Sequence, residues 1–432
     1  MAFVCLLLAA APSPAADPPL EKPWYENLAP EWGGHVRVQG LTSRPSSQSY
    51  FQPVGTEPYY DGIFDFRLKN KVYLGDWGYF VTHYEAAGQA GDTQRKTNAL
   101  RKLHPELFGA GLLSVGPISD DRRLFDLTRV VSSDDSYVLY HRLDRLFLAW
   151  QPAWGNVRLG RQALTWGNGM LFNPMDLCNP FSPLDFTRDY KVGDDMVYTQ
   201  VSTGDKDWQF IYVPRRDPAT RDIEWEKSSV AGKLHLAKGT TEFDLMAAKH
   251  YRDYVSGLGA TGYLGDAAWR VNATWTFLQE DYRDKEGYLS LVANMDYSWV
   301  WWGKNFYGWI EFYYSGLGKD DYTKALASPE VAERLDRGEI FALGRSYLDA
   351  QLKIELHPLF NAYLTVIANL HDPSGAWQPR GEWNLTQNSQ IIFGANLYFG
   401  GTDTEYGGVQ IPGSDLRNTP APAAYLRYTY FF

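Results

Sequence analysis

Apolar and polar residues alternate along most of this chain of 432 residues. In SYLDAQLKIEL, residues 346–356, every second residue from Leu348 onward is apolar, and the residues between them are polar or charged. Successive side chains of a β-strand point to opposite faces, so this period predicts a strand with one apolar and one charged face. The same pattern recurs in GIFDFRLKNKVYL and WRVNATWTF, and after the first residues no segment approaches the roughly 18 consecutive apolar residues of a membrane helix.

The predicted strands are joined by two kinds of connection. About 18 strands fit along the chain, and the connections after even-numbered strands are short. The odd-numbered connections include long ones, at residues 45–60, 90–136, 168–193, 214–227, 316–345 and 401–423. One two-faced strand would also suit a soluble sandwich, but a sandwich has no reason to sort its connections by parity, whereas a bacterial outer-membrane barrel has short periplasmic turns and longer external loops. We therefore predict an all-β fold, a transmembrane antiparallel β-barrel, because a closed sheet satisfies every backbone polar group in lipid.

The composition is typical of a barrel that crosses a membrane with strands. The chain carries 29 Tyr, 22 Phe and 16 Trp, although its mean hydropathy is only -0.38. Aromatic rings are enriched at both interfaces of such barrels. The net charge of -10 argues against a dominant basic patch, so we expect no nucleic acid among the partners.

The first residues predict export. MAFVCLLLAAAPSPAA holds a short apolar run followed by a small-residue site, as in a secretory signal peptide, although no Lys or Arg precedes the run. We expect a signal peptide at 1–15, a periplasmic N-terminal segment at 16–31 and an outer-membrane barrel at 32–432. Cys178 is then the one cysteine of the mature chain, which excludes an internal disulfide.

The last residues, AYLRYTYFF, alternate in the same way and end on Phe432. They resemble the terminal strand of Gram-negative outer-membrane β-barrels, which the outer-membrane assembly machinery reads. The resemblance implies a location in the outer membrane of a Gram-negative bacterium, with outer-membrane lipid, lipopolysaccharide and that machinery as partners. A core strand of a soluble protein is the competing interpretation of this segment taken alone.

The long connection at 168–193 is both apolar and broken by prolines. It begins GNGMLFNPMDLCNPFSPLDF, which suits neither helix nor strand because proline fixes the backbone and removes amide donors. Exposing these side chains would cost about 25 cal/mol per Å², so we expect this third external loop to fold inward and constrict the pore. It resembles the constriction loop of general porins; a lid on the outer rim or a docking segment for a partner is the alternative. The candidate constriction residues are Phe172, Asn173, Pro174, Asp176, Asn179, Pro180 and Asp185.

A narrower resemblance begins just before this loop. Gly160-Arg161-Gln162, Trp166-Gly167 and Asn173-Pro174-Met175-Asp176 resemble the G-R-Q…W-G…N-P-x-D pattern of a group of uncharacterised proteobacterial outer-membrane barrels. The strand number also resembles that of alginate-export barrels, but the predicted inward positions are not uniformly basic, which speaks against transport of a polyanion. The resemblance implies kinship and names no solute.

Inward positions of opposite charge are predicted on two sides of the pore. Basic residues lie near the seam where the last strand would close against the first, and acidic residues lie roughly across the barrel. Such an arrangement would set up a transverse field that orients polar solutes; the alternative is a salt-bridge lattice that stiffens the wall. The predicted pore-lining residues are Arg37, Arg67, Lys69, Lys71, Arg427, Glu242, Asp244, Asp296, Glu311, Asp349, Lys353 and Glu355.

No motif of an enzyme stands out. The sequence has no H-x-x-x-H, C-x-x-C or G-x-S-x-G, and its histidines are scattered. Adjacent carboxylates at Asp120-Asp121 and Asp194-Asp195 could hold a cation, but such pairs are common in loops, so we predict no metal, no cofactor and no enzymatic activity.

The sequence thus predicts a porin-like channel for small polar or charged solutes, constricted by the loop at 168–193. The alternative is an outer-membrane sheath or export barrel that serves a periplasmic partner, such as a multihaem cytochrome or glycan-export machinery. Whether the barrel forms a homo-oligomer is left open, because flat aromatic outer faces such as YSWVWWG suit lipid and subunit contacts alike.

Overall fold

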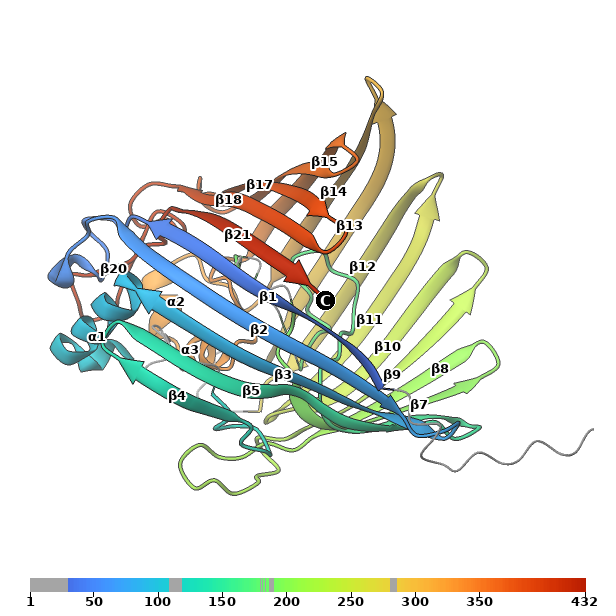
Figure 1. Cartoon of the computed structure of the whole chain (residues 1–432). Helices are drawn as coiled ribbons and strands as arrows, with labels where there is room; N and C mark the ends of the chain where they lie inside the picture. Colours follow the sequence, from blue (N-terminus) through green and yellow to red (C-terminus); the bar gives the residue numbers. More distant parts are fainter. Residues whose placement is uncertain are drawn as a thin grey trace, which may run out of the picture.

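The two-faced segments pair with their neighbours to form a closed antiparallel β-barrel of 18 strands (Figure 1). The computed structural model describes residues 30–108, 119–178, 180, 182, 184–185, 190–279 and 286–432. The predicted signal peptide, nearly all of the predicted periplasmic segment and Asn179 lie outside the described residues. The all-β class, the antiparallel barrel and the strand number are confirmed.

The barrel strands follow one another around the wall in chain order. They are β1 (Pro30–Ser43), β2 (Tyr59–Tyr73), β3 (Gly78–Gly91), β5 (Tyr137–Trp150), β6 (Gly155–Gln162), β7 (Asp194–Thr203), β8 (Lys206–Val213), β9 (Ser229–Lys238), β10 (Thr241–His250), β11 (Asp253–Leu264), β12 (Ala267–Phe277), β13 (Gly287–Trp301), β14 (Lys304–Ser315), β15 (Ser346–His357), β16 (Phe360–Asn369), β17 (Gly375–Thr386), β18 (Ser389–Phe399) and β21 (Ala423–Phe431).

The last strand closes the barrel against the first. Val38 of β1 lies opposite Phe64 of β2 on one side and opposite Tyr428 of β21 on the other. β21 pairs with β18 along its second edge. Closure leaves the wall without an open strand edge, so the backbone groups of the wall are paired as a membrane interior requires.

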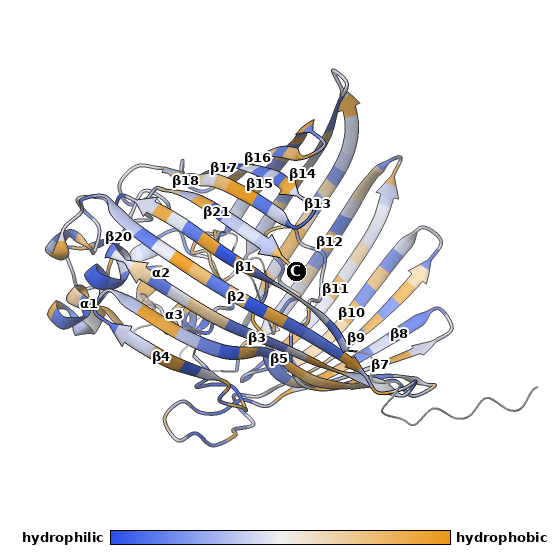
Figure 2. Ribbon diagram, viewed as in Figure 1, coloured by the Kyte–Doolittle hydropathy of each residue, from blue (hydrophilic) through white to orange (hydrophobic). Residues whose placement is uncertain are grey.

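The two faces of the wall differ as the alternation predicts. On β2, Phe64 is 41% exposed on the outer face, whereas its neighbour Asp65 is 2% exposed on the inner face. The same alternation places Leu245 and Ile310 outside and Asp244 and Glu311 inside. Figure 2 shows apolar and polar residues alternating along the strands.

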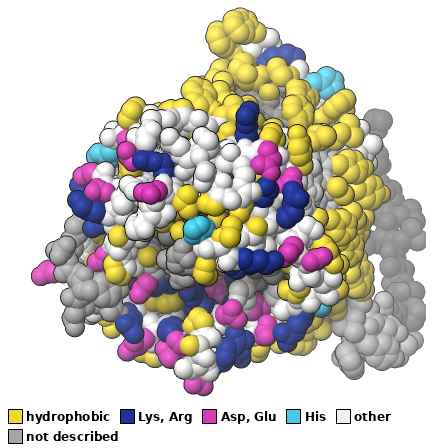
Figure 3. Space-filling model, turned by 90° about the vertical axis from the view of Figure 1, so that its left-hand side faces the viewer, with side chains coloured by type: hydrophobic (Ala, Val, Ile, Leu, Met, Phe, Trp, Pro, Cys, Tyr) yellow, Lys and Arg dark blue, Asp and Glu magenta, His cyan; other side chains and the backbone are white. Residues whose placement is uncertain are grey.

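The connections are sorted by rim. Short turns at one end join β2 to β3, β5 to β6, β7 to β8, β9 to β10, β11 to β12, β13 to β14, β15 to β16 and β17 to β18. The other end carries the long connections, with α1 (Asp92–Leu103), η3 (Pro105–Phe108), β4 (Thr128–Asp134), α2 (Tyr322–Ala327), α3 (Pro329–Asp336), η2 (Gln52–Val54), β19 (Val409–Gln410) and β20 (Arg417–Asn418). In a view onto this end, Lys and Arg side chains are interspersed with Asp and Glu side chains on the surface (Figure 3). Among the described helices, none has the length and apolar character needed to cross a membrane.

The third long connection begins earlier than the sequence pattern predicts. Alternation predicts a strand up to Gly167, but β6 ends at Gln162. Leu164 and Trp166 instead pack against apolar side chains of β7 to β11. Apolar alternation in this segment therefore reflects packing of a loop, and the third connection spans residues 163–193.

Candidate functional site in the barrel interior

The third connection is fastened to one side of the barrel by a carboxylate. Glu311 of β14 has no exposed surface and accepts hydrogen bonds from the backbone N–H groups of Met170 at 2.5 Å and of Leu171 and Phe172 at 2.9 Å. Asn294 of β13 donates to Glu311 at 3.0 Å through its Nδ2 atom. One ionisable side chain thus satisfies three consecutive amides of a segment that has no strand partner.

The end of the same connection is fastened near the seam. The Tyr190 hydroxyl donates to Asp65 of β2 at 3.2 Å, and the Arg67 guanidinium lies 3.7 Å from the centroid of the Tyr190 ring. Arg145 of β5 donates to the carbonyl oxygen of Lys191 at 2.8 Å. The described residues of the connection therefore contact β14 on one side of the barrel and β2 and β5 on another.

Apolar packing explains the composition of this segment. Trp166 and Met175, 3% and 0% exposed, belong to a cluster with apolar side chains of β7 to β11. Phe172 stacks on Tyr313 of β14, with ring centroids 4.3 Å apart, within a second apolar cluster that includes Tyr347. Burial of apolar surface at about 25 cal/mol per Å² offsets the cost of ordering the segment.

Two glycines allow its tight turns. Gly167 has a φ of 82°, and a Cβ there would lie 2.2 Å from Asn173 Oδ1. A Cβ on Gly169 would lie 1.8 Å from the carbonyl oxygen of Phe172. Asn173 also donates to the carbonyl oxygen of Trp166 at 2.8 Å. The W-G and N-P parts of the sequence pattern, together with the Asn168-Gly169 that follows W-G, therefore form one turn structure.

The residues proposed for the constriction lie in different surroundings. Phe172 and Asn173 take part in the contacts above, Asp176 forms an ion pair with Lys191, and Pro174 lines a small cavity beside β11 to β14. Asp185 lines a larger cavity described below. Pro180 is among the described residues, but no contact there assigns it a role. Asn179 lies outside the described residues.

The predicted pore-lining residues lie on barrel strands, on the face opposite the exposed apolar side chains. Glu311 and Asp349, opposite each other on β14 and β15, are both 0% exposed, so neither faces an open passage. The other predicted positions are Arg37, Arg67, Lys69 and Lys71 on β1 and β2, Arg427 on β21, Glu242 and Asp244 on β10, Asp296 on β13, and Lys353 and Glu355 on β15.

Carboxylates near the seam pair with the basic residues there. Arg37 lies 2.5 Å from Asp65, Arg67 pairs with Asp144, and a further arginine of β5, Arg142, lies 2.7 Å from Glu85 of β3. The predicted pore-lining residues did not include Asp65, Glu85, Arg142 or Asp144. Their positions in the alternating pattern of the strands would have placed them on the inner face. This local pairing favours the salt-bridge lattice over a field that crosses the barrel.

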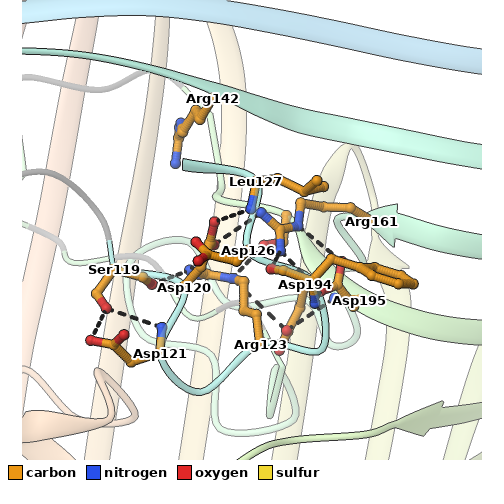
Figure 4. A network of polar contacts seen from close by, with 12 residues as sticks. Ser119, Asp120, Asp121, Arg123, Asp126, Leu127, Arg142, Arg161, Asp194 and Asp195 are labelled. Atoms are coloured by element: carbon orange, nitrogen blue, oxygen red, sulfur yellow. Dashed lines mark hydrogen bonds and ion pairs between the residues drawn. The ribbon is translucent and has the colours of Figure 1, made fainter. Parts of the chain in front are cut away.

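A second polar network joins the ends of β6 and β7, on either side of the third connection, to the neighbouring external loops. Arg161 at the end of β6 donates to Asp120 Oδ1 and to Asp195 Oδ1, each at 2.9 Å, and Arg215 donates to Asp194 at 2.9 Å. Figure 4 shows these carboxylates turned toward arginines.

The network also determines the charge state of Asp120. Its arginines bind the carboxylates that a metal ion would otherwise use as ligands. Burial alone would raise the pKa of Asp120, but the Arg161 and Arg123 guanidinium groups beside it hold the pKa below its ordinary value. Asp120, Asp194 and Asp195 are thus bound by arginine. Within the described residues, no group of three or more His, Cys, Asp or Glu side chains is placed to hold a metal ion.

A cavity of about 650 Å³ remains inside the barrel. Its lining comes from the seam strands, from β15 to β18 and from the third connection, and it includes Lys69, Arg427, Gln351, Leu171 and Tyr190. The cavity is thus bounded on one side by the loop and on the other by polar side chains of the wall.

The barrel has the fold of outer-membrane porins. OccK5 (OpdH) of Pseudomonas aeruginosa matches with a TM-score of 0.53 and 10% identity, over 93% of this chain and 97% of that chain. OccAB1 of Acinetobacter baumannii gives 0.52 and 7%, over 93% and 96%, and a BenF-like porin from Pseudomonas fluorescens Pf-5 gives 0.51 and 10%, over 93% and 98%. No protein-family model and no curated protein matches the chain. At such identities the likeness establishes the fold, and the solute has to be argued from the interior.

Proposed function

We propose that this protein is a porin-like channel of the Gram-negative outer membrane that passes small polar or charged solutes. The cavity of about 650 Å³ inside a closed barrel, lined largely by polar side chains, is the observation that carries the proposal. The exposed apolar outer face supports a lipid environment. The shared fold with porins is consistent with this class, and kinship with the G-R-Q barrels or with alginate-export barrels stays a prediction from the sequence.

In this proposal the connection at 163–193 folds into the lumen and narrows the passage. The hydrogen bonds of Met170, Leu171 and Phe172 to Glu311 hold its first part, and Tyr190 and Lys191 hold its end. Solute then passes through the space left between the loop and the wall formed by β15 to β18, β21 and β1.

Conductance of the purified protein in planar lipid bilayers tests both parts. We expect conductance steps of defined size for the full chain and larger steps after deletion of residues 170–185, provided that the variant still migrates as a folded barrel. Absence of conductance with and without the deletion would refute the channel. Equal steps for both proteins would show that the loop is not the constriction.

A further inference from the structure

The cavity wall carries a row of uncharged polar side chains, Gln351, Thr365, Gln378 and Asn396, which we call the neutral row. Gln351 lies opposite Thr365, and Thr365 lies opposite Gln378, on consecutive strands. Gln351 Nε2 donates to Thr365 Oγ1 at 2.8 Å, and Gln378 Nε2 donates to Asn396 Oδ1 at 3.2 Å. The row thus runs around β15, β16, β17 and β18 at one level, and all its members line the cavity.

The row keeps hydrogen-bonding capacity for a solute. Among the described residues, no side chain donates to the Oε1 atoms of Gln351 and Gln378, and each amide has two N–H donors of which one is used within the row. A primary amide therefore offers an acceptor and a donor side by side. Hydroxyl groups also donate and accept, so a polyhydroxylated solute can satisfy both atoms of each amide at once.

The charges that line the same cavity are of both signs, with Lys69, Arg380 and Arg427 beside Asp185 and Glu382. Arg380 lies 3.1 Å from Glu382, and the Arg427 Nε atom donates to Gln39 at 2.8 Å. Lys69 and Asp185, which also line the cavity, have opposite charges. An ion that enters loses hydration and meets a lining of nearly balanced charge, whereas a neutral solute does not incur that cost.

Aromatic rings complete the lining. Tyr190 of the loop and Tyr425 of β21 both border the cavity. Each offers an apolar ring face and a polar hydroxyl, which suits a solute with apolar C–H faces and polar edges. The volume lies within the range of about 300–1,000 Å³ that small-molecule sites occupy.

We propose that the cavity selects neutral polyhydroxylated solutes of the size of small sugars over ions of the same size. The selection rests on the proposed channel function and assigns its substrate class. The neutral row supplies the hydrogen bonds, and the nearly balanced charges around it give little net attraction to an ion of either sign.

Swelling of liposomes that contain the purified full chain tests the proposal with three probes of nearly one size: glucose, gluconate and glucosamine in mildly acidic buffer. We expect glucose to enter fastest. The double variant Gln351→Leu, Gln378→Leu should slow the entry of all three probes, which share their hydroxyl groups, by about five-fold for each hydrogen bond lost. Gln151→Leu, the same change at an exposed residue of a short turn, is the matched control and should behave as wild type.

The outcomes separate this proposal from the channel itself. Faster entry of gluconate or glucosamine than of glucose would overturn the substrate class and leave the channel standing. Unchanged entry of glucose in the double variant would also overturn it, because the row would then supply no hydrogen bonds to the solute. No entry of any probe, together with no conductance in bilayers, would refute the channel.

Discussion

The carboxylate of Glu311 offers the sharpest test of how the third connection is held. Its Oε1 atom accepts from Leu171 and Phe172, and its Oε2 atom accepts from Met170 and from Asn294. Glu311→Gln keeps the size of the side chain but retains one acceptor oxygen. If that oxygen stays on Leu171 and Phe172, an amide N–H₂ group faces two donors, and two hydrogen bonds are lost.

Asn294 cannot easily relieve this conflict, because its Nδ2 atom also donates to the carbonyl oxygen of Asn168 at 3.0 Å. Hydrogen bonds to a charged group contribute about 1.5–3 kcal/mol each. Loss of two therefore favours release of the loop by at least about 3 kcal/mol, which is about a 10²-fold larger released population. The barrel itself should persist, since its strands do not depend on the loop.

Cys178, a native residue of the connection, reports this release without an introduced cysteine. Its thiol packs against the cluster of Trp166 and Met175, and burial raises its pKa from 9.0 to about 12. Because the thiolate is the reactive form, maleimide labelling at neutral pH is slow until the loop leaves the cluster. We expect Glu311→Gln to accelerate labelling by about 10²-fold when release and return are fast relative to labelling.

Glu57→Gln, the same change at an exposed position of the first external loop, serves as the control and should leave labelling unchanged. Equal labelling rates in Glu311→Gln and wild type would refute the reasoning, provided that both proteins remain folded barrels. The carboxylate would then not be what holds the loop.

Two further changes probe the turn and the arginine network. Gly169→Ala places a Cβ 1.8 Å from the Phe172 carbonyl oxygen, so the turn should open and Cys178 labelling should rise while heat-modifiable migration of the barrel is kept; unchanged labelling would contradict this. Arg161→Ala leaves buried Asp120 and Asp195 without their shared cation, and we expect a loss of about 3–5 kcal/mol in loop docking, seen as faster proteolysis between residues 119 and 127. In wild type the pKa of Asp120 is lowered in the folded state. Ionised Asp120 therefore contributes fully to loop docking above its ordinary pKa of about 3.9, and this contribution is lost as the pH falls through the lower pKa of the folded state. Proteolysis of wild type should therefore be flat from neutral pH down to about 4 and increase only below it.

The sequence determined the wall of this protein. A period of two assigns each residue of a strand to one face, and the sorted connection lengths assign each end of a strand to one rim. The fold class, the number of strands and inward positions such as Arg37 and Asp244 therefore followed from the sequence alone. These are local properties, because neighbouring residues of the chain are also neighbours in the strand.

Only the tertiary structure decided what the inward residues do. Glu311 and Met170 are 141 residues apart in sequence, and their hydrogen bond turns a predicted pore-lining carboxylate into a support for the loop. Arg67 and Asp144 likewise meet across strands, so a basic position predicted to attract solute is already neutralised. Alternation predicts the face of the wall on which a side chain lies, but it does not predict which other side chain it contacts. Burial and ion pairing depend on that contact partner. The same limit hid the neutral row, whose members are unremarkable along the chain and form a surface only when four strands bring them to one level.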